Sequence, residues 1–481
     1  MARDQDYRPK PRVARGFQDR RGGELSRERS VIAAISRVFE HWGFEPLETP
    51  ALEYADALGK FLPDQDRPNE GVFALQDDDS HWLALRYDLT APLARFVAEH
   101  FDSLPKPYRR WAAGRVWRNE KPGPGRYREF TQCDADSVGA PGPAADAEMI
   151  ALACAALSAA GLPNGAFALK LSTRRLLNGL LEGIGVAEAD GARRLTVLRA
   201  IDKLDRLGPE AVALLLGPGR KDESGDFTKG AGLAPAHIEA VLAFLQAGAG
   251  ARSETLARLA SALPPGAEVE AGLAELTAID SLLTAQGVGS RLARIDPSIV
   301  RGLEYYTGAV FEAELLAGGQ ALGSIGGGGR YDGLVARFRG QPAPATGFSV
   351  GVSRLVAALD GAGPLASPVV VLVLDAAEIA ASFAMAAELR AAGVAAEVYL
   401  GGAGLKAQLK YADKRGAPVA VLQGEEERAR GVVTLKDLKL GAELSRDIAD
   451  REAWRAAKPA QIECPREALV AHVQALLGAR P

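Results

Sequence analysis

Three arginines, Arg118, Arg301 and Arg354, stand among glycine and aromatic residues beside apolar, strand-like segments. A guanidinium group is rarely buried in such surroundings without a partner. Arg118 is expected on a strand, Arg301 opens the segment RGLEYYTG, and Arg354 is expected at the start of a helix that follows a strand. If the three converged, they would bind a polyphosphate through paired hydrogen bonds. Each one alone is more typical of a solvated or ion-paired arginine than of a ligand-binding one.

The absence of several motifs excludes some common kinds of nucleotide-binding and catalytic site. The sequence holds no GxxxxGK[ST] phosphate loop, no GxGxxG fingerprint and no GxSxG nucleophile turn. Its three cysteines, Cys133, Cys154 and Cys464, are far apart and odd in number, which favours reduced thiols over disulfides. No histidine is spaced with a cysteine as a zinc site requires, so we expect no zinc.

Positive charge is concentrated in residues 106–128, which contain eight basic side chains and one acidic side chain, Glu120. The prolines and glycines of residues 122–125 predict an exposed hairpin tip between two antiparallel strands. The net charge of the whole chain is −4, which excludes a uniformly basic surface. The local excess therefore predicts an antiparallel pair that carries a basic loop.

The elements that position these residues follow from periodicity. We expect a helix over 27–42, an extended segment over 44–50, and a strand over 82–87 with a helix beginning at Asp88 or Thr90. From 172 to 290 the pattern is helical, with a glycine-rich loop at 217–232. Beyond a linker at 361–368, strands alternate with helices, which predicts a small α/β domain with a largely parallel sheet.

Length and composition fit a folded protein of roughly three domains. The chain has 481 residues, of which 47% are hydrophobic and 25% charged. No apolar run approaches the roughly 18 residues that span a bilayer, and the first 30 residues lack a signal-peptide core. We therefore expect a cytoplasmic protein without membrane segments.

Several segments together resemble histidyl-tRNA synthetases, which are class II aminoacyl-tRNA synthetases. Phe44–Pro50 resembles class II motif 1, Trp117–Phe130 with its GRYREF loop resembles motif 2, and Gly347–Leu355 resembles motif 3. RGLEYYTG resembles the element particular to the histidine enzymes, and Leu409–Pro418 resembles their C-terminal domain. The combination of RGLEYYTG and GRYREF is the specific part of the resemblance.

The resemblance implies an α/β fold with an α+β catalytic core, in which helices flank an antiparallel sheet of the class II type. It implies four segments: 1–171 as the first part of the catalytic domain, 172–290 as a helical insertion, 291–362 as the second catalytic part, and 363–481 as an α/β anticodon-binding domain. Because motif 1 forms the class II interface, a homodimer is also implied.

The implied reaction joins histidine to tRNA(His) in two steps. Histidine and ATP, the latter with Mg²⁺, form histidyl-adenylate and pyrophosphate, and the histidyl group then moves to the 3′-hydroxyl of the terminal adenosine. In-line attack on a phosphate needs positioning and charge neutralisation rather than a covalent nucleophile. The missing nucleophile motif fits this expectation.

The resemblance also implies residue roles. The catalytic residues are Arg118 at the α-phosphate, Arg301 near the α-phosphate and the histidine carboxylate, and Arg354 on the γ-phosphate side. The ATP site further includes Glu120 and Arg126. The histidine site comprises Asp88, Thr90 and Gln132 at the α-amino group, Asp136 and Tyr305 at the imidazole, Arg301, and Tyr306 closing the pocket.

The tRNA contacts implied are Lys121, Gly123 and Arg128 on the motif 2 hairpin and Lys406 and Lys410 in the C-terminal domain, with Lys414 and Lys436 as further lysines on the anticodon side. Many bacterial relatives carry Arg and Gln at positions 121 and 123, where they read an additional 5′ guanylate. Glycine has no side chain with which to read a base edge. We therefore expect an altered readout of the acceptor end.

Other interpretations stay open at this point. Asp88 alone is typical of a helix N-cap, Tyr305 and Tyr306 of strand packing, and Gly326–Gly329 of a flexible turn. A non-catalytic regulatory subunit of ATP phosphoribosyltransferase has a synthetase-like fold, and other class II synthetases use the same three motifs. The retained arginines and the residues after 363 favour the histidine enzyme.

Overall fold

The computed structural model describes residues 8, 10–61, 71–123, 126–187, 189–221, 225–248, 250–300, 306–316, 323–359, 367–444 and 460–478. The chain forms two compact units, Met1–Gly363 and Pro364–Pro481. Arg301, Tyr305 and residues 124–125 of the predicted hairpin tip lie outside the described residues.

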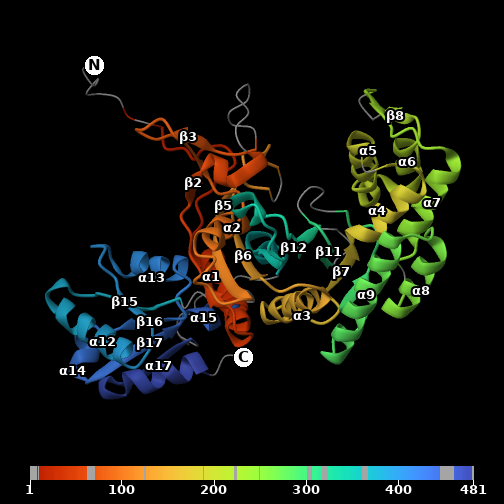
Figure 1. Ribbon diagram of the computed structural model, residues 1–481. Coiled ribbons are helices and arrows are strands. Elements are labelled where there is room, and N and C mark those ends of the chain that lie inside the picture. Colours follow the sequence, from red (N-terminus) through yellow and green to blue (C-terminus); the bar gives the residue numbers. More distant parts are fainter. Residues whose placement is uncertain are drawn as a thin grey trace. The chain divides into compact units, whose positions relative to one another are not determined.

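The first unit is built on an eight-stranded sheet (Figure 1). Its strands run in the order β1 (Glu45–Pro46), β5 (Tyr108–Trp117), β6 (Glu129–Val138), β13 (Ala345–Gly351), β12 (Ser324–Arg330), β11 (Ala309–Leu315), β7 (Phe167–Thr173) and β10 (Ala293–Ile295). The two outermost pairs are parallel and every pair between them is antiparallel. The predicted antiparallel core is confirmed.

One face of this sheet is apolar and buried by helices. Cys133 and Ala135 of β6, Phe348 of β13 and Phe311 of β11 belong to the main hydrophobic core. They pack with residues of α1 (Gly22–His41), α3 (Pro143–Ala159) and α11 (Val352–Ala358). Helix α3 is apolar around its whole circumference because it also packs against α9 (Ala267–Ala285) on its far side.

A second, three-stranded sheet follows the segment predicted as motif 1. Its order is β2 (Leu52–Tyr54), β4 (Trp82–Leu85) and β3 (Ala74–Gln76). The helices η1 (Ala55–Phe61), α2 (Thr90–Glu99) and α10 (Ala336–Arg339) accompany it. On one face Leu52, Tyr54 and Leu75 stay 40%, 56% and 46% exposed, so much of this apolar face is open to solvent.

The region between β7 and β10 is helical, as predicted. It contains α4 (Arg174–Gly183), α5 (Gly191–Ile201), α6 (Leu204–Leu216), α7 (Pro235–Gln246), α8 (Arg252–Ala262) and α9. The loop predicted over 217–232 is instead partly a hairpin of β8 (Gly219–Lys221) and β9 (Phe227–Lys229). Gly219 has φ +115°, and a Cβ there would lie 2.3 Å from the Thr228 carbonyl oxygen, so its glycines build the hairpin. The four-part domain division stays a prediction.

The second unit contains a five-stranded mixed sheet in the order β15 (Ala396–Val398), β14 (Val369–Val371), β16 (Val419–Leu422), β17 (Val432–Asp437) and β18 (Gln461–Pro465). The first three strands are parallel, but β17 and β18 are antiparallel, so the predicted largely parallel sheet is only partly right. Its helical elements are η2 (Ala376–Glu378), α12 (Ile379–Ala391), α13 (Leu405–Lys414), α14 (Glu425–Ala429), α15 (Leu438–Leu444), η4 (Arg466–Ala468) and α17 (Leu469–Gly478).

Among the described helices of both units, none combines the length and apolar character needed to cross a membrane.

Candidate active site

The other face of the large sheet is polar and lined by glycine. Because side chains alternate along a strand, Gln132, Asp134 and Asp136 of β6 share this face. Their partners on β13 are Gly351, Ser349 and Gly347, in that order. On the next strand, Gly327 pairs with Ser349 and Gly329 pairs with Gly347. The result is a floor of glycine-rich backbone bordered by two carboxyl groups and an amide.

The glycines of β12 are required by their neighbours rather than by a turn. A Cβ at Gly326 would lie 2.7 Å from Phe348 Cζ, and one at Gly328 would lie 2.5 Å from Phe311 Cε2. On the polar face, a Cβ at Gly329 would lie 2.8 Å from Tyr306 Cδ1, whereas Gly327 has its nearest neighbour at 3.6 Å. The flexible-turn interpretation of 326–329 is therefore wrong, because all four glycines lie in a central strand.

Asp136 is the most tightly held carboxyl group of this face. It is 2% exposed. Its Oδ2 lies 2.8 Å from Arg110 Nη2, and Tyr331 donates its hydroxyl to Oδ1. Burial raises the pKa of Asp136, while Arg110 and the Tyr331 hydrogen bond oppose that rise. Gly347 is needed here because a Cβ at that position would lie 1.9 Å from Asp136 Oδ1.

Gln132, Ser349 and Asp134 form a hydrogen-bonded chain across β6 and β13. Gln132 Nε2 donates to Ser349 Oγ at 2.7 Å, and Ser349 Oγ donates to Asp134 Oδ1 at 2.5 Å. Asp134 is 1% exposed, and burial, reinforced by the charge of Asp136, raises its pKa to about 8. Neither Asp134 nor Ser349 was predicted as a site residue.

Asp88 lies at the start of α2, where its Oδ1 accepts hydrogen bonds from the Thr90 and Ala91 backbone N–H groups at 3.2 and 2.9 Å. The predicted capping role is thus present in the structure. Burial raises the pKa of Asp88, and the Ala91 N–H and the Arg118 charge oppose the rise. The charges of Asp88 and Asp134 also act on each other, so Asp88 belongs to the same electrostatic group as the carboxyl groups of β6.

Arg118 lies one residue beyond the end of β5 rather than on the strand as predicted. Its Nε donates to the Tyr87 carbonyl oxygen at 3.2 Å, and its guanidinium lies 5.2 Å from the centre of the Phe130 ring. Arg354 stands in the first turn of α11, as predicted, where Nη1 donates to the Ser324 carbonyl oxygen at 2.7 Å. Both guanidinium groups are thus placed at strand ends by backbone carbonyls.

Arg86, which sequence reasoning missed, joins the segment predicted as motif 1 to β5. Its Nη1 donates to the Thr49 carbonyl oxygen at 2.6 Å, and its Nε donates to the Arg115 carbonyl oxygen of β5 at 2.9 Å. Gly114 leaves room for it, since a Cβ there would lie 2.5 Å from Arg86 Nη2. The role of Arg86 is therefore to position the segment 44–50 against β5.

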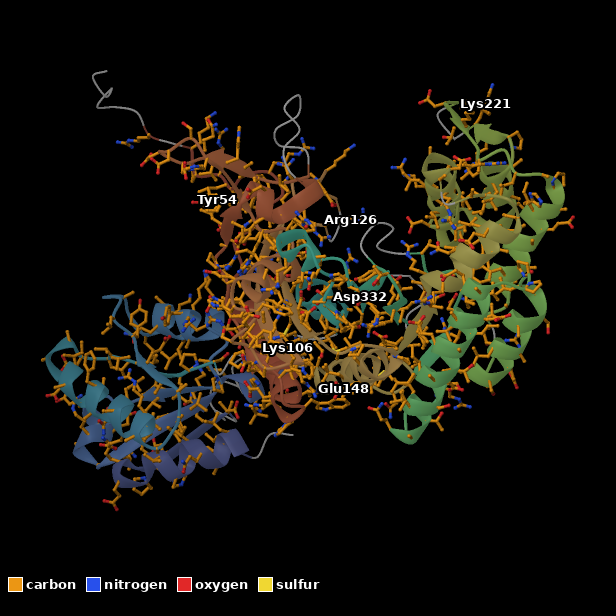
Figure 2. The ribbon with its side chains drawn as sticks, viewed as in Figure 1. Tyr54, Lys106, Arg126, Glu148, Lys221 and Asp332 are labelled. Atoms are coloured by element: carbon orange, nitrogen blue, oxygen red, sulfur yellow. The ribbon has the colours of Figure 1, made fainter. Side chains whose placement is uncertain are left out.

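The predicted basic hairpin needs correction. Arg110 is buried against Asp136, Arg109 pairs with Glu148 at 2.9 Å, and Arg115 pairs with Glu129 at 3.2 Å. Figure 2 shows Lys106 and Glu148 at the opposite end of the unit from Arg126. The positive charge is thus spread along β5 and the β5–β6 connection, and it is partly neutralised because every second residue of a strand faces the protein.

At the tip itself, Lys121 and Arg126 are exposed, and the backbone groups of Gly123 and Arg126 pair with each other. Glu120 is also exposed, and its carbonyl oxygen accepts from Arg128 Nε at 3.0 Å. Arg128 further lies 6.0 Å from the centre of the Phe73 ring, and its backbone N–H donates to the Gly16 carbonyl oxygen. Arg128 therefore links the N-terminal segment around Gly16 to the hairpin.

The remaining predicted residues are placed as follows. Thr90 opens α2, and Tyr306 packs beside Gly329. Lys406 and Lys410 are exposed on α13 of the second unit.

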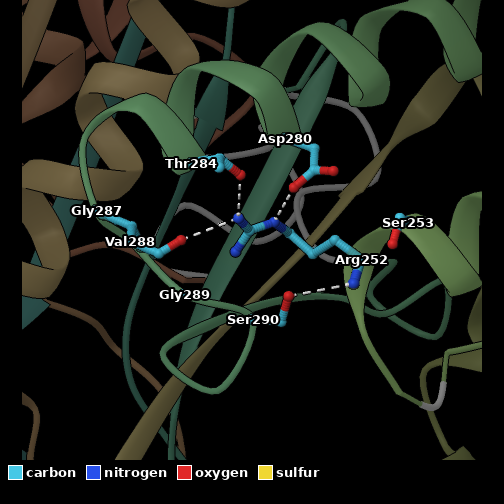
Figure 3. Close-up of a pocket in the computed structure, with 8 residues that line it drawn as sticks. All are labelled: Arg252, Ser253, Asp280, Thr284, Gly287, Val288, Gly289 and Ser290. Atoms are coloured by element: carbon cyan, nitrogen blue, oxygen red, sulfur yellow. Dashed lines mark hydrogen bonds and ion pairs between the residues drawn. The ribbon is translucent and has the colours of Figure 1, made fainter.

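A pocket of about 330 Å³ lies in the helical region and contains none of the predicted site residues (Figure 3). It is lined by Arg252, Ser253, Asp280, Thr284, Gly287, Val288, Gly289 and Ser290. Arg252 is 2% exposed and donates to Asp280, Thr284 and the Val288 and Ala293 carbonyl oxygens. These contacts satisfy the Arg252 guanidinium group, so its role is to hold α8 against α9.

Within the described ranges, no three His, Cys, Asp or Glu side chains gather as a metal site.

Comparison with known proteins decides the family. The family model for histidyl-tRNA synthetase matches residues 16–355, and the model for an anticodon binding domain matches residues 368–458. The chain belongs to the histidyl-tRNA synthetase family.

The histidine–tRNA ligase of Caulobacter vibrioides is 57% identical to this chain over 486 residues, and that of Brucella ovis is 54% identical over 492 residues. The two alignments cover 98% and 99% of this chain, respectively, and 98% of each relative. A histidyl-tRNA synthetase structure from Nostoc sp. PCC 7120 is 28% identical with a TM-score of 0.76, covering 97% of this chain and 99% of that one. These findings confirm the predicted family and the class II fold.

The alternative that this chain is a non-catalytic regulatory subunit of ATP phosphoribosyltransferase is less supported. A Bacillus halodurans structure titled as an ATP phosphoribosyltransferase regulatory subunit/histidyl-tRNA synthetase is 26% identical with a TM-score of 0.67 and covers 84% of this chain. The curated ligases match at about twice that identity over nearly the whole chain, including the region matched by the anticodon-binding model.

Proposed function

We propose that this chain is a histidine–tRNA ligase that activates histidine with ATP on the glycine-lined face of its large sheet and then transfers it to tRNA(His). The observation that carries the proposal is the juxtaposition, on this one face, of Asp136, Gln132 and the nearby Asp88 over bare backbone. A small cationic amino acid fits such a floor, because its ammonium and imidazole N–H groups meet carboxyl and amide oxygens.

In this proposal the α-ammonium group of histidine binds Asp88, Thr90 and Gln132. Asp136 accepts an N–H of the imidazole ring, together with Tyr305, while Tyr306 closes the pocket over Gly329. Arg110 favours the ionised form of Asp136. A site that hydrogen-bonds its substrate rejects an analogue lacking those groups by on the order of 10⁴, because its own polar groups are left unpaired.

The phosphates of ATP bind the arginines at the strand ends. Arg118 and Arg301 neutralise the α-phosphate and Arg354 the γ-phosphate side, with Glu120 and Arg126 beside them. A histidine carboxylate oxygen attacks the α-phosphorus, and pyrophosphate leaves with the electron pair of the broken P–O bond. Mg²⁺ enters as part of the ATP substrate complex. Catalysis then rests on positioning and on charge stabilisation in the transition state.

In the second step the terminal 3′-hydroxyl of tRNA(His) attacks the carbonyl carbon of the adenylate and AMP leaves. Lys121, Gly123 and Arg128 lie on the hairpin proposed to meet the acceptor end, and Lys406 and Lys410 lie on the unit matched by the anticodon-binding model. We further propose a homodimer, supported by the exposed apolar face of Leu52, Tyr54 and Leu75, directly after the motif 1 segment.

Histidine-dependent exchange between ATP and pyrophosphate by the purified chain tests the proposal. We expect exchange with histidine and none with threonine, proline or glycine. The variant Arg301→Ala should slow exchange far more than it weakens histidine binding, because Arg301 stabilises charge that develops in the transition state. Absence of exchange in the wild-type chain would remove the enzymatic proposal, and equal losses in both quantities would remove this role of Arg301.

A further inference from the structure

The Gln132 side chain has one end fixed and one end unpaired. Its Nε2 donates to Ser349 Oγ at 2.7 Å, whereas its Oε1 is buried and has no hydrogen-bond partner among the described residues. Gln132 is 8% exposed and stands opposite Gly351. The cross-strand neighbour therefore has no side chain that could satisfy Oε1. A buried, unpaired acceptor is costly, which points to a donor supplied by the ligand.

We infer that Ser349 and Asp134 are positioning residues that hold the Gln132 amide with its Oε1 toward the α-ammonium group of histidine. The inference rests on the proposed function, in which Gln132 binds that group. It gives Ser349 and Asp134 a positioning role, and neither residue has a role among those predicted from the sequence.

The direction of the hydrogen bonds explains how this positioning works. A serine hydroxyl has one proton to donate. In the structure Ser349 donates it to Asp134 Oδ1 at 2.5 Å, so Ser349 Oγ is left as an acceptor toward Gln132. Only the NH₂ end of the Gln132 amide can satisfy that acceptor. The carbonyl end must then face away from Ser349, which is the orientation that a positively charged ammonium group requires.

The strand register keeps the three groups together. Ser349 and Asp134 are directly paired residues of β13 and β6, and Gln132 lies two positions from Asp134 on the same face. Asp134 is 1% exposed, so no bulk water competes for the Ser349 proton. Without Ser349, the amide of Gln132 could rotate by half a turn and present its NH₂ group to the ammonium of histidine.

The variant Ser349→Ala tests the inference, with Ser349→Thr as the control that keeps the hydroxyl. In pyrophosphate exchange we expect Ser349→Ala to raise KM for histidine about tenfold, the usual scale for a hydrogen bond to a charged group. KM for ATP should stay within about twofold, and Ser349→Thr should recover most of the loss. Asp134→Ala should also raise KM for histidine, because the Ser349 proton then loses its acceptor. An unchanged KM for histidine in Ser349→Ala would overturn the inference.

Two inhibitors distinguish a loss of Gln132 orientation from a general disruption of the histidine site. Histidinol keeps the ammonium group and 3-(imidazol-4-yl)propanoate lacks it. Ser349→Ala should weaken inhibition by histidinol about as much as it raises KM for histidine, and leave inhibition by the propanoate unchanged. An equal loss for both inhibitors would contradict the inference.

A double-mutant comparison separates the inference from the proposed function. In a Gln132→Ala background, Ser349→Ala should add less than about twofold to KM for histidine, since the two residues act as one unit. If Gln132→Ala alone leaves KM for histidine unchanged, the assignment of Gln132 fails. If Gln132→Ala raises it and Ser349→Ala does not, only the inference fails.

Discussion

Arg110 and Asp136 stand opposite each other on β5 and β6, and both are almost completely buried. Each would be costly to bury alone. Together with the Tyr331 hydroxyl they form a fixed polar group in the floor of the site. A carboxyl group held in this way keeps one orientation before the substrate arrives, which lowers the cost of binding.

At Arg118 we expect a loss of rate rather than of stability. Arg118→Ala should lower kcat of histidine-dependent pyrophosphate exchange by roughly 10²–10³, the scale for removing one transition-state donor. Its thermal midpoint should change little, because the side chain is only partly buried. The control is Arg430→Ala, which removes an exposed pair with Glu463 in the second unit. A fall in kcat below tenfold would exclude Arg118 from the α-phosphate role.

Asp134 makes the stability of the chain depend on pH. Its pKa in the fold, about 8, lies above the value of 3.8 that an ordinary aspartate has. The neutral form is thus favoured by folding, and this stabilisation is complete at low pH and lost as the pH rises toward 8. Between pH 5 and pH 9 the wild-type chain should lose more free energy of unfolding than Asp134→Asn. Urea denaturation of both proteins measures this, and parallel curves would contradict the assigned burial effect.

The sequence predicted Asp88, Gln132 and Asp136 because they stand within recognisable segments. It did not reveal Asp134 with Ser349, or Arg110 with Asp136, as interacting pairs. Ser349 is 215 residues from Asp134, and their contact depends on the register between β13 and β6. A slip of one residue would move every side chain of the strand to the other face, and local periodicity does not contain that information.

At the scale of elements, β12 shows why a run of glycines belongs in a central strand. Two of its glycines admit the rings of Phe311 and Phe348 on the apolar face, and the others leave the polar face bare. Composition alone favours a turn for such a run, whereas the neighbouring strands β11 and β13 supply the hydrogen bonds that keep it extended.

Two alanine substitutions on this floor should behave differently. Gly347→Ala places a Cβ 1.9 Å from Asp136 Oδ1 and should cost about 1–3 kcal/mol of stability as well as histidine binding. Gly327→Ala meets its first neighbour only at 3.6 Å and should leave the unfolding midpoint nearly unchanged. Any loss of exchange in Gly327→Ala would then report a substrate lying over the floor. Equal destabilisation of both variants would contradict this description of the floor.

The hairpin between β5 and β6 governs the acceptor end of tRNA in our proposal. With Gly123 at its tip, we expect transcripts of tRNA(His) with and without the additional 5′ guanylate to be aminoacylated at similar rates, within about tenfold, because no side chain at 123 reads that base. Measuring kcat/KM for both transcripts decides the matter. Strict dependence on the guanylate would show that another residue reads it.

At the scale of the whole molecule, the two units have separate hydrophobic cores. Apolar residues of β14, α12, β16 and α17 form the core of the second unit, and the core beneath the large sheet belongs to the first. The alternating strands and helices after residue 368 predicted this second unit. The antiparallel addition of β17 and β18 was missed, because a short apolar strand carries no mark of its direction.

Lysines on the second unit should affect tRNA binding without affecting amino-acid activation. The double variant Lys406→Ala/Lys410→Ala should lower tRNA affinity and reduce the slope of log K against log salt by about 1–2. Its histidine-dependent pyrophosphate exchange should match the wild-type chain, which serves as the internal control. An unchanged salt slope would show that both lysines only keep α13 soluble.

The close packing around the glycines of β12 and β13 also predicts how these positions tolerate mutation. At Gly326, Gly328, Gly329 and Gly347 even one added methyl group meets an atom of the protein within 3 Å. In a library of all single substitutions, selected only for growth, these positions should stand out as nearly invariant, although none carries a reactive group. The intolerant positions would therefore mark the two central strands β12 and β13 that carry the site, without any assay of the reaction.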